Sequence, residues 1–242
     1  MDIVFKNNSI EDDVASIISL LKLGSEHTRV KEYICEYFEL PKEILDEDNS
    51  ILEELVKKVV TNEKIKNKDT IDRKINESQK LWNKNCKNIN CILSDIFECK
   101  FNNNLINAVL SVNCVCPYDF EKRIIYINYR KNVLEIQETC VHELIHYYWF
   151  NKWKQLFNER CEDNLIWSFS EIAIDAIFKE TELRQYCISK FPAHKHLYEI
   201  KYNGQNMMKY FRTLYRDNSI TEFMKIGIEI IKKIEREGNS LR

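Results

Sequence analysis

The sequence contains few of the residues that interrupt regular structure, with only four glycines and three prolines among 242 residues. This scarcity argues against a turn-rich β architecture and favours long helices. Because 44% of the residues are hydrophobic, the chain can bury a substantial core, and a disordered chain is not expected. We therefore expect an α+β protein that is predominantly helical, with one small antiparallel sheet.

Neither sign of charge is in excess, because 36 Lys and Arg residues nearly balance 38 Asp and Glu residues. The chain therefore offers no overall electrostatic attraction to nucleic acid or to an anionic membrane. Its first residues, MDIVFKNNSIEDDV, are acidic where a secretory signal is basic, and no window of about 18 uncharged apolar residues follows. We expect a soluble, cytoplasmic protein without a nucleic-acid or membrane partner; its oligomeric state stays open.

The nine cysteines include no C-x-x-C pair. Two groups, Cys114 with Cys116 and Cys86 with Cys91 and Cys99, have spacings that fit no zinc-knuckle pattern. In a chain without a secretory signal, cysteines are typically reduced thiols rather than a disulfide framework. We do not expect them to form a metal site.

The first part of the chain, residues 1–101, is expected to be a helical region without a catalytic motif. Ser9 and Asp12 form a capping pair that predicts a helix ending near Gly24. The polar stretch TNEKIKNKDT reads as a linker between helices. The other helices expected here cover residues 28–40, 50–60, 71–82 and 89–96.

Residues 102–242 are expected to form a second domain that opens with strands. β-branched and aromatic residues dominate Leu105 to Val115 and Arg123 to Tyr129, on either side of a Pro-Tyr-Asp turn, which predicts the antiparallel sheet. Asn132 with Glu135 forms a capping box that begins a long helix. The remaining helices are expected near residues 163–179, 205–216 and 220–236.

The long helix carries the segment HELIH, residues 142–146. Four helical steps place His142 and His146 on the same side, one turn apart, where both imidazoles can bind one ion. Glu143 points about 100° away from His142 and can reach a water molecule on that ion. In this H-E-x-x-H arrangement the metal acidifies a water and the glutamate takes its proton. The alternative is a pair of histidines that only pack in the core.

The next helix has a polar stripe on an otherwise apolar surface, formed by Asn164, Ser168, Glu171 and Asp175. Buried carboxylates require a compensating positive charge, and no lysine or arginine lies in the middle of this segment. One Zn²⁺ with Glu171 as its third ligand would provide it and keep a fourth position for water. Asp175 is then expected to accept the outer N–H of a ligating histidine. A solvated helix face is the alternative.

HELIH, followed 25 positions after His146 by EIAID, resembles the gluzincin metallopeptidases, the thermolysin-like zincins with H-E-x-x-H and a downstream Glu-x-x-x-Asp. The resemblance covers about residues 105–179. It implies a compact zincin-like peptidase domain with one zinc ion bound by His142, His146 and Glu171, with Glu143 as general base and Asp175 in support. NAVLSV, from Asn107, resembles the edge strand that pairs with an extended peptide or protein substrate in that group, and IIYINY resembles the next strand.

The resemblance also implies a Tyr or His beyond the zinc helices that stabilises the oxyanion. FPAHKHLYEIKY offers His194, His196, Tyr198 and Tyr202, and we favour His196 or Tyr198. The expected function is zinc-dependent peptide hydrolysis.

Two other functions stay open, a catalytically silent zincin-like regulatory or binding protein and a zinc hydrolase acting on a non-peptide amide. The first hundred residues are also open to interpretation as a prosegment or lid that places Asp46, Glu47 or Asp48 in the water position.

Overall fold

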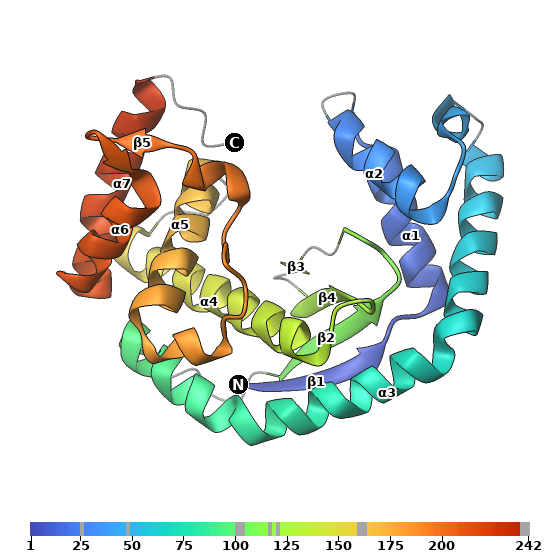
Figure 1. The fold of residues 1–242 in the computed structure, drawn as a ribbon, viewed down its shortest axis with the longest axis horizontal. Coiled ribbons are helices and arrows are strands. Elements are labelled where there is room, and N and C mark those ends of the chain that lie inside the picture. The colour runs from blue at the N-terminus through green and yellow to red at the C-terminus, as the bar shows by residue number, and fades with distance from the viewer. Residues whose placement is uncertain are drawn as a thin grey trace. The chain divides into compact units, whose positions relative to one another are not determined.

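A computed structural model of the chain describes residues 1–24, 27–46, 49–99, 105–115, 118–119, 122–158 and 164–237. The protein is predominantly helical with a small sheet, as predicted (Figure 1). It consists of two compact units, one formed by Met1–Lys84 with Asn103–Ile136 and the other by Asn85–Asn102 with Gln137–Arg242. The predicted division after residue 101 therefore does not match the units, since each contains residues from both sides of it.

The first unit contains a four-stranded mixed sheet in the order β1-β2-β4-β3. β1 (Asp2–Asn7) runs parallel to β2 (Leu105–Ser111), and β2 runs parallel to β4 (Ile124–Asn128). Only β3 (Tyr118–Asp119) is antiparallel to its neighbour, β4. The prediction of an antiparallel sheet made of the two longer strands was wrong, because the hairpin joins β3 to β4 and not β2 to β4.

β2 is an interior strand, which corrects its predicted role as the edge that pairs with substrate. Its two neighbours, β1 and β4, occupy both of its hydrogen-bonding edges. The free backbone edge of β1 is partly capped by Gln79, whose amide accepts from Phe5 N at 3.0 Å and donates to Ile3 O at 3.0 Å. Such capping reduces the tendency of an edge strand to pair with another chain.

One face of the sheet is part of the hydrophobic core. Alternate residues of three strands point to this face, as the two-residue period of a strand requires. They are almost completely buried, at 0–6% exposure: Ile3, Phe5, Ile106, Ala108, Leu110, Ile125 and Ile127.

Two helices and a short 3₁₀ turn follow β1 in the first unit. Ser9 begins α1 (Ile10–Leu21) by accepting a hydrogen bond from Asp12 N at 2.9 Å, so the predicted cap is confirmed. α2 (Thr28–Phe38) and η2 (Lys42–Asp46) follow. Residues 47 and 48, two of the three predicted lid carboxylates, lie outside the described residues, and the side chain of Asp46 is not described either.

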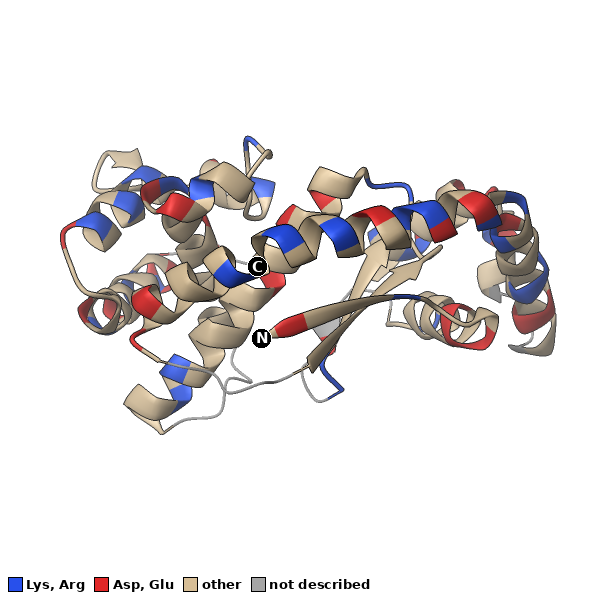
Figure 2. Cartoon of the chain, turned by 90° about the horizontal axis from the view of Figure 1, so that it is seen from below, with Lys and Arg blue, Asp and Glu red and all other residues tan. Residues whose placement is uncertain are grey.

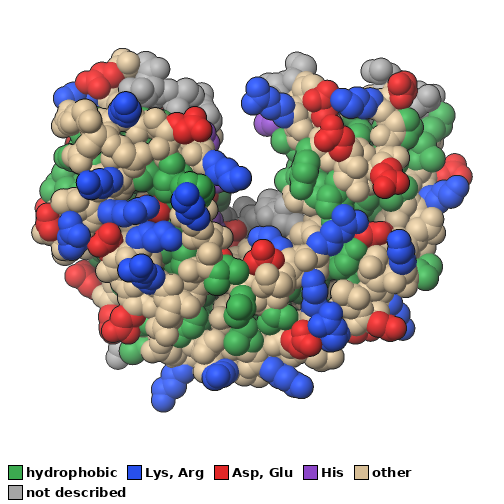
Figure 3. Space-filling view, viewed as in Figure 1, with side chains coloured by type: hydrophobic (Ala, Val, Ile, Leu, Met, Phe, Trp, Pro, Cys, Tyr) green, Lys and Arg blue, Asp and Glu red, His purple; other side chains and the backbone are tan. Residues whose placement is uncertain are grey.

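A single helix of 49 residues, α3 (Asn49–Phe97), replaces the three shorter helices that we expected. The presumed linker TNEKIKNKDT contains no glycine or proline, and its Lys, Glu and Asn residues are compatible with a solvated helix. Acidic and basic residues are interspersed along α3 (Figure 2), and side chains of both signs are present on the face of the molecule seen in Figure 3. A polar stretch was therefore mistaken for a helix break.

The second unit is built around α4 (Val133–Phe157) and α5 (Asn164–Glu180). An aromatic cluster joins α5 to the closing helices α6 (Met207–Arg216) and α7 (Ile220–Arg236). Phe169 is central to it, with ring centroids 4.9 Å from Trp149, 5.7 Å from Phe211 and 5.5 Å from Phe223. The short elements of this unit are η3 (Glu182–Tyr186), η4 (Lys195–Tyr198) and the hairpin β5 (Lys201–Tyr202) and β6 (Gln205–Asn206).

Gly227 allows α7 to pack closely against α5. A Cβ atom at this position would lie 2.2 Å from Cζ of Phe169, which is fully buried.

Within the described residues, no helix is both long enough and apolar enough to cross a bilayer.

A buried ion pair joins α1 to α3 in the first unit. The carboxylate of Asp13 is completely buried and lies 2.9 Å from Lys64 Nζ, whose side chain is 8% exposed. Asp13 also accepts hydrogen bonds from Asn8 and Ser111. The network therefore connects both helices to the ends of β1 and β2.

We expect Asp13→Ala to lower the free energy of unfolding by about 3–5 kcal/mol, because it leaves the buried Lys64 ammonium without its anionic partner. Urea denaturation followed by circular dichroism measures this change. Glu11→Ala, on the exposed side of the same helix, serves as the control and should cost less than about 1 kcal/mol. Equal losses for the two variants would contradict the assignment.

Candidate metal centre

The capping box before HELIH is present as predicted. Glu135 N donates to Asn132 Oδ1 at 3.0 Å, and Asn132 N donates to a Glu135 carboxylate oxygen at 2.6 Å. Both first-turn donors are thereby satisfied, which defines where α4 begins. From that start, helical periodicity places His142 and His146 on one side, and their ring centroids lie 4.9 Å apart.

The structure brings together the three predicted ligands, one pair on α4 and one residue on α5. Glu171 Oε1 lies 3.1 Å from His146 Nε2 and 3.7 Å from His142 Nε2. All three ligand atoms lie within 4.8 Å of one another. Ligands bound tetrahedrally to zinc at about 2.0–2.2 Å are separated by about 3.3–3.6 Å. The group can therefore hold one metal ion with little rearrangement.

Two polar atoms of this group are buried without a hydrogen bond. Glu171 Oε2 and His146 Nδ1 have no hydrogen-bond partner among the residues that the structure describes, and the two residues are 3% and 1% exposed. Burial alone raises the pKa of Glu171, but hydrogen bonds from His142 and His146 outweigh it and hold that pKa well below its ordinary value. The carboxylate is therefore ionised, and a buried anion of this kind is stabilised by a bound cation.

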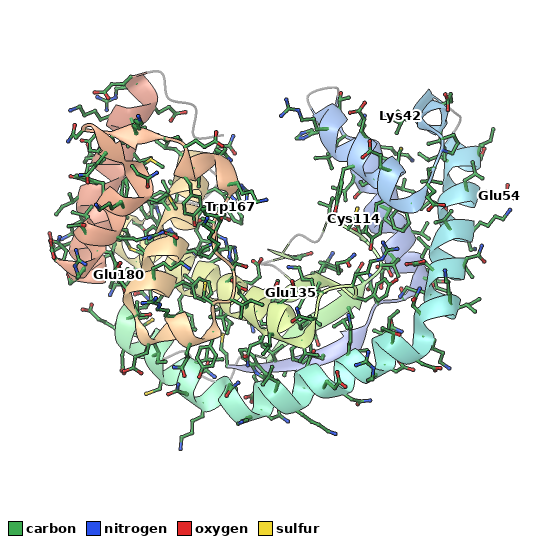
Figure 4. The ribbon with its side chains drawn as sticks, in the orientation of Figure 1. Lys42, Glu54, Cys114, Glu135, Trp167 and Glu180 are labelled. Atoms are coloured by element: carbon green, nitrogen blue, oxygen red, sulfur yellow. The ribbon has the colours of Figure 1, made fainter. Side chains whose placement is uncertain are left out.

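Aromatic side chains from α4 and α5 stack against the imidazole of His146. Trp167, labelled in Figure 4, lies one turn before Glu171, and its ring stacks on His146 with centroids 4.8 Å apart. Phe150 lies 5.8 Å from the same imidazole in a nearly parallel orientation. His142 is more accessible, with 20% of its side chain exposed. The site therefore has one closed side and one side open to solvent.

Glu143 is partly exposed, next to His142 on α4. Its carboxylate makes no hydrogen bond or ion pair with any other residue that the structure describes. It therefore remains available to accept a proton, as the H-E-x-x-H pattern predicts for a general base.

Asp175 has partners other than the predicted histidine. Arg212 binds it with two hydrogen bonds, of 2.6 and 2.9 Å, and Tyr198 Oη donates to it at 2.8 Å. Because Asp175 is completely buried, these three bonds compensate its charge. The expectation that Asp175 accepts the outer N–H of a ligating histidine is thus corrected. Arg212, nearly forty residues later, could not be recognised from a local pattern.

His194 is the loop residue that approaches the group. Its Nε2 lies 3.7 Å from Glu171 Oε1, as near as that of His142, while 61% of its side chain is exposed. The sequence offers His194 as one of four candidates, but the prediction favours His196 or Tyr198. His196 is exposed on η4, and Tyr198 uses its hydroxyl proton for Asp175. The only sequence signal for His194 was its type and its position after the second helix.

Seven cysteines are described, and they form no disulfide with one another. Among the described residues, His142, His146 and Glu171 form the one group of three or more His, Cys, Asp or Glu side chains that could hold a metal ion. Cys116, part of the other cysteine group considered, lies outside the described residues.

Compared with known proteins, the chain matches no family model, no curated protein and no solved structure.

We expect the purified chain to bind one zinc ion, and His146→Ala to lower its affinity for zinc by about 100-fold or more, since one of three ligands is lost. Competition with a chromophoric chelator measures the affinity. His27→Ala, which removes an exposed histidine of the first unit, is the matched control. Zinc well below one equivalent in the wild type would count against the site.

Zinc should also stabilise the folded chain, because the assembled ligands exist only in that state. At a free zinc concentration 100 times the dissociation constant, the free energy of unfolding should rise by about 2.7 kcal/mol. Thermal unfolding with and without a chelator measures the change. In Glu171→Gln the increase should be much smaller; an undiminished increase would show that zinc binds elsewhere.

Proposed function

We propose that this protein is a zinc-dependent metallopeptidase of the gluzincin type. One observation carries the proposal: a buried, ionised Glu171 faces the two imidazoles of an H-E-x-x-H helix, while the glutamate between them has no partner among the described residues. A purely structural site needs the three ligands but has no use for Glu143. The combination of an open ligand set with an available base is typical of catalytic zinc centres.

His142, His146 and Glu171 would hold the zinc ion. When bound, zinc supplies Lewis acidity that lowers the pKa of a water molecule and polarises a substrate carbonyl. The three ligands have different surroundings, because His146 and Glu171 are buried whereas His142 borders solvent. We infer that substrate approaches from the side of His142, since Trp167 covers the opposite ligand.

Glu143 acts as the general base in this proposal. Its carboxylate accepts a proton from the attacking water and returns that proton to the leaving amine nitrogen when the peptide bond breaks. The partly exposed position of Glu143 allows both groups to reach it. The proton balance closes within one turnover, so no other acid is required.

His194 is proposed to stabilise the negative charge that develops on the carbonyl oxygen, the role that we first gave to His196 or Tyr198. Its imidazole is largely exposed, and its Nε2 is directed at the ligand group. An N–H donor placed near the reacting carbonyl contributes electrostatic stabilisation that increases as the charge forms. The substrate is proposed to be a peptide or protein in an extended conformation, although β2 cannot pair with it because both of its edges are occupied.

We expect Glu143→Gln to lower kcat for hydrolysis of a denatured, fluorescently labelled protein by about 100- to 10,000-fold, because the amide cannot accept the proton. Zinc affinity should stay within a few-fold of the wild type, since Glu143 is not a ligand. Glu229→Gln, an exposed position on α7, is the control for the loss of one carboxylate.

Two results would contradict the proposal. Full activity in Glu143→Gln would exclude this glutamate as the base. A zinc-loaded wild type that cleaves no member of a diverse peptide library would favour a binding or regulatory protein, or an enzyme for a different amide.

A further inference from the structure

The segment from Cys187 to Tyr198, which carries His194, is held at both ends by buried carboxylates of the two ligand-bearing helices. We propose that Glu138 and Tyr198 are positioning residues that hold this segment so that His194 faces Glu171. This inference rests on the proposed function for its catalytic consequence, but the placement of His194 can be measured without turnover.

Glu138 holds the first end of the segment. It lies four residues before His142 on α4, so it occupies the same side of that helix one turn earlier. Its carboxylate is buried and accepts hydrogen bonds from Ile188 N at 3.2 Å and Ser189 N at 3.2 Å. The Cys187 thiol lies 3.5 Å from the same carboxylate. A carboxylate that accepts two backbone N–H groups fixes the loop backbone directly.

Lys179 on α5 adds a further contact to this end. Its ammonium donates to Ser189 O at 3.1 Å. Ser189 therefore has its N–H bound to α4 and its carbonyl bound to α5. Both ligand-bearing helices thus fix the backbone of one loop residue.

Asp175 holds the second end through Tyr198. Asp175 lies four residues after Glu171 on α5, one turn beyond the ligand. Tyr198 Oη donates its single proton to Asp175 at 2.8 Å and accepts a hydrogen bond from Ala193 N at 3.2 Å. Ala193 immediately precedes His194. The hydroxyl of Tyr198 therefore links the buried anion of α5 to the backbone next to the exposed imidazole.

The surroundings of Tyr198 are consistent with this role and exclude its predicted one. Burial and the neighbouring Asp175 carboxylate raise the pKa of Tyr198, so the phenol keeps its proton. That proton is already donated to Asp175, and none remains for a substrate oxygen. The ring of Tyr198 also packs on Phe191 with centroids 4.8 Å apart. Tyr198 thus acts through the loop and not on the substrate.

Tethering of this kind matters because a loop donor contributes to catalysis only when it is held near its productive position. A displacement of about 1 Å can lower a rate by about 100-fold. Functional side chains on loops depend on surrounding hydrogen bonds for that accuracy. Here the residues that bind the loop, Glu138 and Asp175, lie one helical turn from His142 and from Glu171. The position of the loop is therefore fixed relative to the candidate ligands.

Tyr198→Phe tests the proposal, because it removes the hydroxyl and keeps the ring. In the full-length chain with zinc as the only additive, the Hε1 NMR resonance of His194, assigned by its absence in His194→Ala, should shift or broaden. The resonances of His142 and His146 should be unchanged, and zinc affinity should stay within about 2-fold of the wild type, since no ligand is altered. Tyr210→Phe, which removes a hydroxyl from α6, is the matched control and should leave all five histidine resonances in place.

The kinetic part of the test is a double-mutant cycle with peptide substrate. Tyr198→Phe should lower kcat by roughly 10- to 100-fold with little change in KM. In a His194→Ala background the same substitution should have no further effect on kcat, because the residue through which Tyr198 acts is gone. An equal loss in both backgrounds would overturn the proposal, since a general structural role would give that result.

Glu138→Gln is the second variant, and it decides the question if Tyr198→Phe does not fold. It removes the charge of the acceptor for Ile188 and Ser189 and should disturb the His194 resonance in the same way. An unchanged His194 resonance in both folded variants would overturn the proposal. If the wild type hydrolyses no peptide, the proposed function fails, yet the NMR result still decides whether these residues position His194.

Discussion

The arrangement of the second unit depends on one buried anion. Glu171 is 3% exposed and ionised, and three imidazoles direct nitrogen atoms at one of its oxygens from 3.1 to 3.7 Å. Its other oxygen has no hydrogen-bond partner in the described part of the chain. Because a buried charge is costly unless it is compensated, this carboxylate and the histidines form a group that could hold a cation.

Both ligand-bearing helices use the same four-residue spacing to surround that anion. Side chains four residues apart leave a helix in nearly the same direction. Residues on successive turns can therefore make different contacts on the same side of the helix. On each helix one position tethers the loop that carries His194, and on α5 one position also covers a ligand. The positions are Glu138, His142 and His146 on α4, and Trp167, Glu171 and Asp175 on α5.

Much of the local structure could be predicted from the sequence. Ser9 and Asn132 cap helices as expected, and α5 and α7 lie within a residue or so of their predicted ranges. Caps and hydrophobic periodicity depend on residues a few positions apart, which is why they can be read directly. The continuity of α3 was missed because its polar middle lacks an apolar face yet contains no residue that breaks a helix.

Long-range pairing could not be predicted in the same way. β1 joins the sheet beside β2 although about a hundred residues separate them, and β4 is inserted between β2 and β3. A strand's sequence records which of its faces is buried, but not which neighbour it pairs with or in which direction. The same limit applies to Arg212, which compensates Asp175 from a later helix.

The same distinction between local spacing and long-range contacts applies to the candidate site. The sequence by itself predicted the candidate ligand group, because helix pitch places His142 and His146 on one side of a helix and the polar stripe of the next helix marked Glu171 as a carboxylate that needs a counter-charge. Only the tertiary structure decided that His194, and not His196 or Tyr198, approaches the group. A loop takes its conformation from distant hydrogen-bond partners, here Glu138 and Asp175, and no local spacing records those contacts.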